Sequence, residues 1–185
     1  MRRSLLIGLP LLLAGCGLSP VYADGRRGSV ALLLGAVAVD PIPDRAGFLV
    51  RDRLLARLGA GDGGPPRYRL VVRLDDRIEG FGVRGDNSII RERRTLRARW
   101  QLYAEGAQTP LLDATSGADA GIDVVGSEYA TVAAETSALE RLADSIAADI
   151  VARVALFARA QAAAPAGPAL RPQSPAQPPP PALPR

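Results

Sequence analysis

The chain has 185 residues, with 23 basic and 19 acidic side chains, no histidine and a formal net charge of +4 at pH 7. The absence of histidine excludes imidazole bases, histidine metal ligands and the common catalytic triads. A single cysteine, Cys16, excludes an internal disulfide.

The N-terminal segment is typical of a bacterial lipoprotein signal peptide. Arg2 and Arg3 precede an apolar run at 5–14, which is too short to span a bilayer but has the length of a signal-peptide core. The run ends in Leu-Ala-Gly before Cys16, an order that resembles a lipobox, whose cysteine is lipidated and becomes the first residue. We therefore predict a signal peptide at 1–15 and a lipidated linker at 16–28. An ordinary secretory signal with an unrelated cysteine is the alternative.

The first part of the folded domain reads as a strand followed by a helix. Val30–Val39 is apolar and stops before Pro41 and Pro43, which predicts a strand. Asp44 is expected to be the N-cap of a helix that runs through Leu58 and is closed by Gly59. Apolar residues recur along this helix at i+4, as expected for one buried face.

Two segments with alternating apolar and polar residues, Tyr68–Asp75 and Thr95–Tyr103, predict strands with one buried face each. Trp100 falls on the apolar side and is expected in the core, whereas Tyr103 is a cross-strand or rim residue. The glycine-rich stretch at 79–87 predicts a turn between the strands. Arginines occupy the opposite, open face of the predicted sheet, with the last two near its end: Arg69, Arg73, Arg97, Arg99, Arg91 and Arg93.

The remaining elements complete the predicted domain at 29–159. A turn at 105–108 leads to a short strand, Leu111–Thr115, and no element is assigned at 117–125. Tyr129–Ala158 then reads as one long helix, capped by Ser127 or Thr131. Nine of the 16 prolines lie in the last segment, which predicts a disordered tail at 160–185.

The order strand, helix, three strands, helix predicts an α+β fold, in which two helices pack on one face of a four-stranded, mostly antiparallel sheet. The arginine row then has three interpretations: a solvated surface, a contact for an anionic ligand, or a contact for a protein partner. Asp75, Asp76 and Glu79 could bind a cation weakly, but a solvated hairpin end is the preferred interpretation. No cofactor or metal site, and no catalytic residue, is predicted.

Four stretches in this order resemble the LPS-assembly lipoprotein family, LptE. They are "LAGCGLSPVY" at 13–22, "IPDRAGFLVRDRLLARL" at 42–58, "PRYRLVVRL" at 66–74 and "SEYATVAAETSALERLADSIAADIVARV" at 127–154. The resemblance implies a fold of two helices on a four-stranded sheet. It also implies a non-enzymatic protein that plugs the outer-membrane β-barrel LptD and helps lipopolysaccharide reach the outer leaflet.

With this role, the expected partners are LptD, lipopolysaccharide and the outer membrane, the last through acyl chains such as palmitate on Cys16. Nucleic acid is not an expected partner. The chain departs from the family pattern in its proline-rich tail and in using arginine where many relatives use lysine. The alternative function is that of an adaptor or pilotin for another envelope transport or secretion system.

Overall fold

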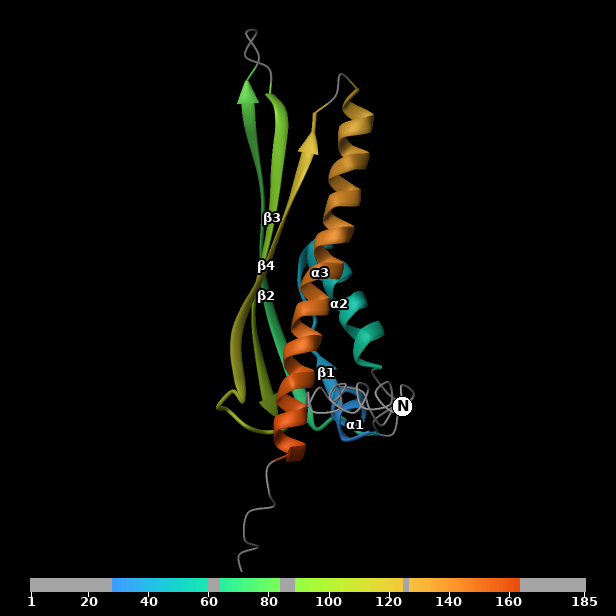
Figure 1. Ribbon diagram of the computed structural model, residues 1–185, viewed down its shortest axis with the longest axis vertical. Coiled ribbons are helices and arrows are strands. Elements are labelled where there is room, and N and C mark those ends of the chain that lie inside the picture. The colour runs from blue at the N-terminus through green and yellow to red at the C-terminus, as the bar shows by residue number, and fades with distance from the viewer. Residues whose placement is uncertain (1–27, 60–63, 84–88, 125–126, 164–185) are drawn as a thin grey trace, which may run out of the picture.

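The computed structural model describes residues 28–59, 64–83, 89–124 and 127–163, which form a sheet with helices packed on one of its faces (Figure 1). Both the predicted signal peptide and Cys16 lie outside these residues, as does the tail after Ala163. Among the described helices, none combines the length and the apolar composition that crossing a lipid bilayer requires.

The sheet has four strands in the order β1-β2-β3-β4. Short β1 (Val37–Val39) pairs in parallel with β2 (Tyr68–Val83), and β2, β3 (Ile89–Ala104) and β4 (Leu112–Asp123) form an antiparallel meander. The predicted α+β class and the mostly antiparallel sheet are confirmed.

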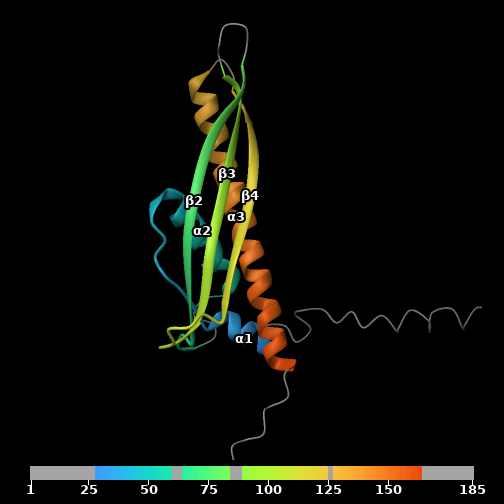
Figure 2. The ribbon, with the colours of Figure 1, turned by 90° about the vertical axis from the view of Figure 1, so that its left-hand side faces the viewer.

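One face of the sheet is apolar and lies against the helices, whereas the other is open to solvent (Figure 2). Even-numbered positions of β2 and β3 face the helices, as the alternation predicts, and those at 70–72 and 96–102 are buried. Trp100 is 1 % exposed, so its predicted core position is confirmed. The buried even-numbered residues of these two strands are Leu70, Val72, Leu96, Ala98, Trp100 and Leu102.

Three helices are present rather than two, because the predicted strand at Val30–Val39 is mostly helical. Residues Ser29–Gly35 form α1, and only Val37–Val39 pair with the sheet. The run is apolar on all sides, and such a run has no periodicity that separates a buried strand from a buried helix. Contacts of α1 with α3 (Glu128–Ala163) explain its burial.

The helix predicted at 44–58 is confirmed as α2 (Asp44–Leu58). Gly59 closes it in the left-handed conformation with φ of 65°, as expected for a glycine after a helix. The predicted cap is wrong, because Pro43 occupies the N-cap position and Asp44 is the first helical residue, with a positive φ of 68°.

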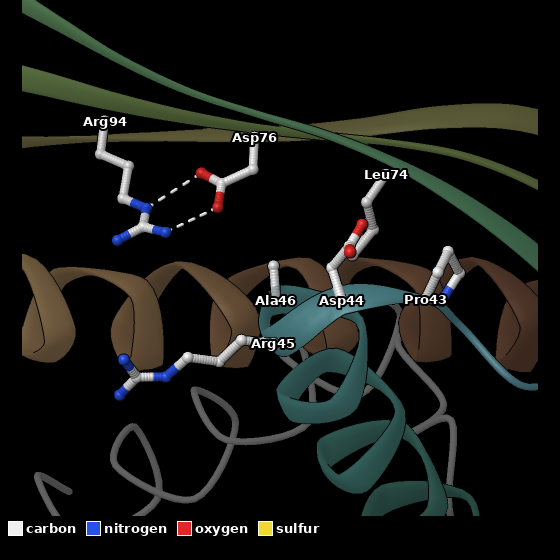
Figure 3. A pocket seen from close by; sticks show the side chains of 7 residues that line it. All are labelled: Pro43, Asp44, Arg45, Ala46, Leu74, Asp76 and Arg94. Atoms are coloured by element: carbon white, nitrogen blue, oxygen red, sulfur yellow. Dashed lines mark hydrogen bonds and ion pairs between the residues drawn. The ribbon is translucent and has the colours of Figure 1, made fainter.

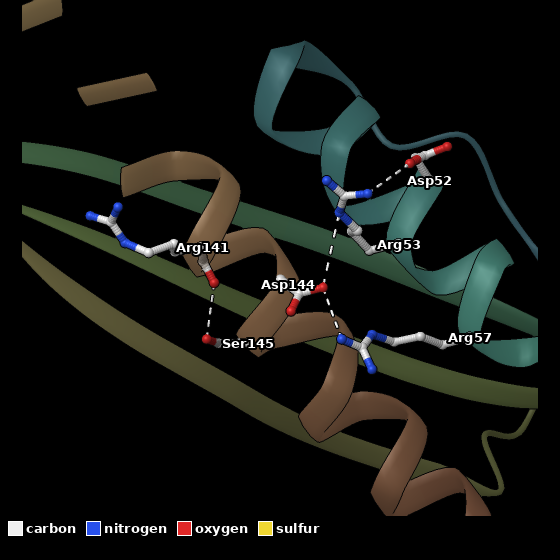
Figure 4. Close-up of polar contacts among 6 residues, drawn as sticks. All are labelled: Asp52, Arg53, Arg57, Arg141, Asp144 and Ser145. Carbon is white, nitrogen blue, oxygen red and sulfur yellow. Dashed lines mark hydrogen bonds and ion pairs between the residues drawn. The ribbon is translucent and has the colours of Figure 1, made fainter. Parts of the chain in front are cut away.

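The long helix is confirmed and extends beyond its predicted limits to Glu128–Ala163, so it includes the first four residues of the predicted tail. At its start, the Ala130 N–H donates a hydrogen bond to the Ser127 hydroxyl at 3.4 Å, so Ser127 is the capping residue. Asp144 of α3 accepts a hydrogen bond from Arg57 at 2.8 Å and pairs with Arg53 at 4.0 Å, which joins α3 to α2 (Figure 4).

The strands are longer than the sequence pattern predicts. β2 continues through the expected turn to Val83, and β4 covers most of the segment without an assignment. The remaining part of the predicted turn, residues 84–87, lies outside the described residues. Small side chains explain the short prediction for β4, because Ala and Ser alternate there with Asp, Thr and Gly and give a weak apolar signal.

A chain of hydrogen bonds that begins in the core and ends at the surface fixes α3 against the sheet. The Trp100 Nε1–H donates to the Ser116 hydroxyl at 3.0 Å, and this hydroxyl donates to Asp149 Oδ2 at 2.6 Å. Arg153 donates to the same carboxylate, with Nε 3.2 Å from Oδ1. Because buried polar groups need partners, this chain favours a single rotation of α3 about its axis.

Gly47 lies where α2 closely approaches the segment before it. A Cβ atom at this position would lie 2.6 Å from the Ile42 carbonyl oxygen. We therefore expect Gly47→Ala to lower the free energy of unfolding by about 2 kcal/mol, as overpacking does, despite the better helix propensity of alanine. Chemical denaturation followed by circular dichroism measures the change.

Gly121→Ala on β4 is the matched control, because a Cβ atom there meets nothing within 4 Å. Its free energy of unfolding should stay at or above that of the wild type. Equal stability of the two variants would show that α2 adjusts to the added methyl group at no cost.

Candidate functional site

The open face of the sheet carries a row of arginines that we call the arginine face. Odd-numbered positions of β2 and β3 point to this side, opposite the buried even-numbered positions. All six arginines predicted to share an open face lie here, and Arg77 joins them. Arg77 was not predicted to lie on this face because β2 was expected to end at Asp75, although the alternation continues to Glu79. The arginine face consists of Arg69, Arg73, Arg77, Arg91, Arg93, Arg97 and Arg99.

Aspartates of β4 lie beside the arginines of β3. Asp123 pairs with Arg91 at 3.1 Å, Asp113 with Arg99 at 3.1 Å and Asp119 with Arg97 at 3.8 Å. The antiparallel register creates these pairs. Asp123 is directly opposite Arg91, whereas Asp113 and Asp119 each lie two positions along β4 from the residue opposite their arginine. The sequence pattern missed Asp119 and Asp123, since β4 was predicted only as far as Thr115.

Two further arginines have acidic partners on the β1–β2 side. Arg69 pairs with Asp40 at 3.2 Å, and its guanidinium lies 5.0 Å from the centre of the Tyr103 ring, so Tyr103 is confirmed as a cross-strand partner. Arg77 pairs with Asp75 of its own strand at 3.0 Å. Seven arginines stand against six carboxylates, so this face has a net charge of +1; the carboxylates are Asp40, Asp75, Glu79, Asp113, Asp119 and Asp123.

Arg73 and Arg93 differ from the other members of the arginine face. Within the described ranges, neither has a carboxylate partner. Arg93 lies over the Phe81 ring at 5.4 Å, and Arg73 is directly opposite Arg99 in the ladder. Two guanidinium groups at facing positions repel each other unless an anion or a carboxylate lies between them.

A shallow cavity marks the facing arginines. It has a volume of about 160 Å³ and is lined by Val71, Arg73, Arg99 and Gln101. These residues supply guanidinium and amide donors on an apolar floor, so the chemistry of the cavity fits a small anionic group.

Electrostatics support a tight pair at the end of the arginine face. The pKa of Asp113 is lowered, first by the hydrogen bond from Arg99 and then by that from Gln101. The pKa of Arg99 is raised by the same carboxylate. Asp113 therefore remains ionised below the ordinary range of an aspartate, and it holds Arg99 toward β4.

The inner side of the sheet contains a second cavity, of about 320 Å³, between β2 and the start of α2 (Figure 3). Arg94 and Asp76 form a two-bonded pair there at 2.9 and 2.6 Å, and Arg94 also donates to the Glu135 carbonyl oxygen at 3.1 Å. The pair is half-buried and links β2 and β3 to α3.

The possible cation cluster of Asp75, Asp76 and Glu79 is not assembled. Asp76 points to the helical side, toward Arg94, whereas the other two acids lie on the open face. Among the residues that the structure describes, no group of three potential ligands could hold a metal ion.

Comparisons with known proteins agree on the fold. A family model, described as LptE: Lipopolysaccharide-assembly, matches residues 34–154. A putative lipoprotein from Caulobacter crescentus has a similar structure, with a TM-score of 0.61, 23% identity, and coverage of 72% of this chain and 98% of that chain. Uncharacterized lipoprotein B from Nitrosomonas europaea has a TM-score of 0.51 and 13% identity, covering 67% of this chain and 84% of that chain. No curated protein matches the chain.

The Asp113–Arg99 pair should be detectable by titration. Because the folded-state pKa of Asp113 is lowered, its contribution to stability is present above the unfolded-state pKa and disappears as the pH falls through the folded-state value. We expect Arg99→Gln to raise the pKa of Asp113 toward its ordinary range. The pKa of Asp113 is measured by NMR, from its carboxyl carbon chemical shift between about pH 2 and 6, a range that brackets the ordinary aspartate pKa.

Arg77→Gln is the matched control, since it removes an arginine of the same face that pairs with Asp75 instead. The pKa of Asp113 should not change in this variant. An unchanged value in Arg99→Gln as well would mean that Gln101 alone holds the carboxylate.

Proposed function

The chain belongs to the LptE lipopolysaccharide-assembly family, and from this premise we propose that it plugs the LptD β-barrel of the outer membrane and assists the insertion of lipopolysaccharide into the outer leaflet. In this role it is not an enzyme. It acts by occupying the barrel lumen and by contacting the anionic parts of the lipid.

Arg73 and Arg93 are the observation that carries the proposal. The other five arginines of the face are paired with aspartates, and with Glu79 counted the surface keeps a net charge of +1 and, among the described residues, two unpaired guanidinium groups. Lipid A phosphates and the acidic sugars of the core are anionic, and guanidinium groups bind such groups through two parallel hydrogen bonds. A polar, mixed-charge face also suits the polar interior of a large barrel.

Anchoring in the outer membrane is the second part of the proposal. Acylation of Cys16 would attach the chain to the membrane, because each buried methylene contributes about 0.8 kcal/mol and several chains together anchor firmly. Gly17 follows the cysteine in place of an aspartate, which by resemblance to lipoprotein sorting rules favours the outer membrane. The folded domain then faces the periplasm and the barrel lumen.

Affinity capture of the full-length lipoprotein from mildly solubilised outer membranes tests the partner. We expect a large β-barrel at about one copy per captured chain, identified by mass spectrometry. Recovery of a secretin, or of an inner-membrane transporter, would instead support an adaptor or pilotin role and would contradict the plug.

Arg93→Glu tests the use of the arginine face. Arg93 forms no ion pair within the described residues, so its reversal breaks none, unlike reversal of Arg97 or Arg99. Because Glu79 faces Arg93 in the ladder and like charges at facing positions are destabilising, circular dichroism first establishes that the variant is folded. We expect a loss of about tenfold in affinity for lipopolysaccharide or for the barrel, as for one charged hydrogen-bonding group. Binding of purified lipopolysaccharide and capture of the barrel are measured separately, which distinguishes the two contacts.

Arg45→Glu is the matched control, because it makes the same charge change at an exposed position on the helical side. It should leave both measurements unchanged. If Arg93→Glu also changes neither of them, the arginine face is a solvated surface.

A further inference from the structure

The shallow cavity on the arginine face lies between the start of β2 and the end of β3, on the side of the sheet that Figure 2 turns toward the viewer. Its four lining residues are two directly facing pairs of the ladder, Val71 with Gln101 and Arg73 with Arg99. Its volume is about 160 Å³, whereas about 10–15 Å³ is enough to hold one water molecule. The cavity therefore has room for a group of the size of a phosphate.

The facing arginines distinguish this place from the rest of the arginine face. Elsewhere in the ladder, Arg97 faces an aspartate and Arg93 faces a glutamate. Among the described pairs of β2 and β3, Arg73 and Arg99 form the one pair in which two bases face each other. Like charges at facing positions are destabilising, and an anion between the two guanidinium groups removes this repulsion.

Both arginines keep hydrogen-bond donors that the protein does not use. A guanidinium has five N–H groups. Within the described residues Arg73 forms no hydrogen bond or ion pair, so all five of its donors are available. Arg99 donates to Asp113 from Nε and Nη2, at 3.4 and 3.1 Å, which leaves its Nη1 group. The two side chains can thus hold an anion that accepts several hydrogen bonds at once.

Gln101 is held with its amide oxygen occupied. The Tyr103 hydroxyl donates to Gln101 Oε1 at 2.9 Å, and Gln101 Nε2 donates to Asp113 Oδ2 at 2.8 Å. These two bonds fix the orientation of the amide. Its oxygen, which would repel an anion, faces the tyrosine, and the second N–H of Nε2 remains for a ligand. Tyr103 is therefore a positioning residue for this cavity.

Asp113 of β4 is an internal competitor for the same donors. Its carboxylate accepts hydrogen bonds from Arg99 and Gln101, two of the four cavity residues, and these bonds lower its pKa. Both side chains of the Asp113–Arg99 pair are exposed, and exposed ion pairs are weak. A ligand with more charge and more acceptor oxygens can therefore take over the Arg99 donors, while Asp113 turns to solvent.

The arrangement favours a phosphate over a carboxylate. A carboxylate has two oxygens, which a single guanidinium satisfies through two parallel hydrogen bonds. A phosphate monoester has three terminal oxygens and a charge of about −1.5 to −2 at pH 7, so it can bind both guanidinium groups together. Its charge matches theirs once the aspartate has moved away.

We propose that this cavity is a phosphate subsite, formed by Arg73, Arg99 and Gln101. The phosphate lies between the two guanidinium groups and displaces Asp113 from Arg99. This inference rests on the proposed function, because the phosphates of lipid A are the ligands in that role. Free inorganic phosphate has the same chemistry, and the experiment separates the two sources.

The test measures binding of purified lipid A to the full-length lipoprotein in detergent, with the lipid phosphates present or enzymatically removed. Arg73→Gln should bind phosphorylated lipid A about tenfold more weakly than the wild type, as for one charged hydrogen-bonding group. Its affinity for the dephosphorylated lipid should not change. Arg77→Gln is the matched control, because it makes the same charge change on the same strand and face but lies opposite Thr95. It should leave both affinities near the wild-type values.

Asp113→Asn tests the competition. Removal of the competing carboxylate should raise the affinity for phosphorylated lipid A by up to about fivefold, the upper range for one exposed ion pair. Asp119→Asn makes the same charge change on the same strand, beside Arg97, and should raise the affinity less. Arg73→Lys keeps the charge but loses the two parallel donors, so it should recover only part of the affinity that Arg73→Gln loses.

Inorganic phosphate, titrated at constant ionic strength, identifies the source of the ligand. The side-chain N–H signals of Arg73 and Arg99 in NMR spectra should shift, and Arg73→Gln should abolish the shift at Arg99. Tighter binding of phosphorylated lipid A assigns the subsite to a lipid headgroup, and equal binding assigns it to free phosphate. Equal losses in Arg73→Gln and Arg77→Gln, or an equal loss for dephosphorylated lipid A, would overturn the subsite.

Capture of the barrel separates this inference from the proposed function. Arg73→Gln should still capture the barrel, which also shows that the variant is folded. A chain that captures no barrel but binds lipid A in a phosphate-dependent way through Arg73 contradicts the plug and supports the subsite. A chain that captures the barrel without any phosphate-dependent effect of Arg73→Gln supports the plug and overturns the subsite.

Discussion

Burial of one face of β2 and β3 under α2 and α3 is the constraint on which the other features depend. Leu70, Val72, Leu96 and Leu102 are each almost fully buried there, and burial of a side chain of this kind stabilises a fold by about 1.5–3 kcal/mol. Because successive side chains of a strand alternate between faces, this burial forces the intervening residues outward. The arginine face is thus a consequence of core packing as much as of any ligand.

The carboxylates beside the arginine face act on charge distribution rather than on stability. Exposed ion pairs contribute between about 0 and 1 kcal/mol each, so the pairs on β4 add little to the free energy of unfolding. Their larger effect is to cancel most of the positive charge and to hold guanidinium groups near the sheet. Arg97, for example, extends across Gly117, where an added Cβ would lie 2.5 Å from its Nη1. The guanidinium groups of this face that have no carboxylate partner among the described residues are those of Arg73 and Arg93.

The sequence pattern was sufficient wherever a strong apolar period was present. It predicted α2, α3, the paired strands around Trp100 and the shared face of six arginines. It failed where local composition was ambiguous. The run after Ser29 is apolar in every direction, so its helix could not be separated from a strand, and the small residues of β4 concealed the aspartates that neutralise Arg91 and Arg97. Ion pairing depends on register between strands, which no single-strand pattern contains.

The alternation of inner and outer positions also determines which sequence changes such a sheet tolerates. Inner and outer faces are distinguished only by whether a position is odd or even, so point substitutions on the open face leave the core intact. One residue inserted between Arg97 and Trp100 would instead turn tryptophan outward and arginine inward along the rest of the strand. We therefore expect the fold to tolerate substitutions on this face, and to tolerate gained or lost residues where strands end.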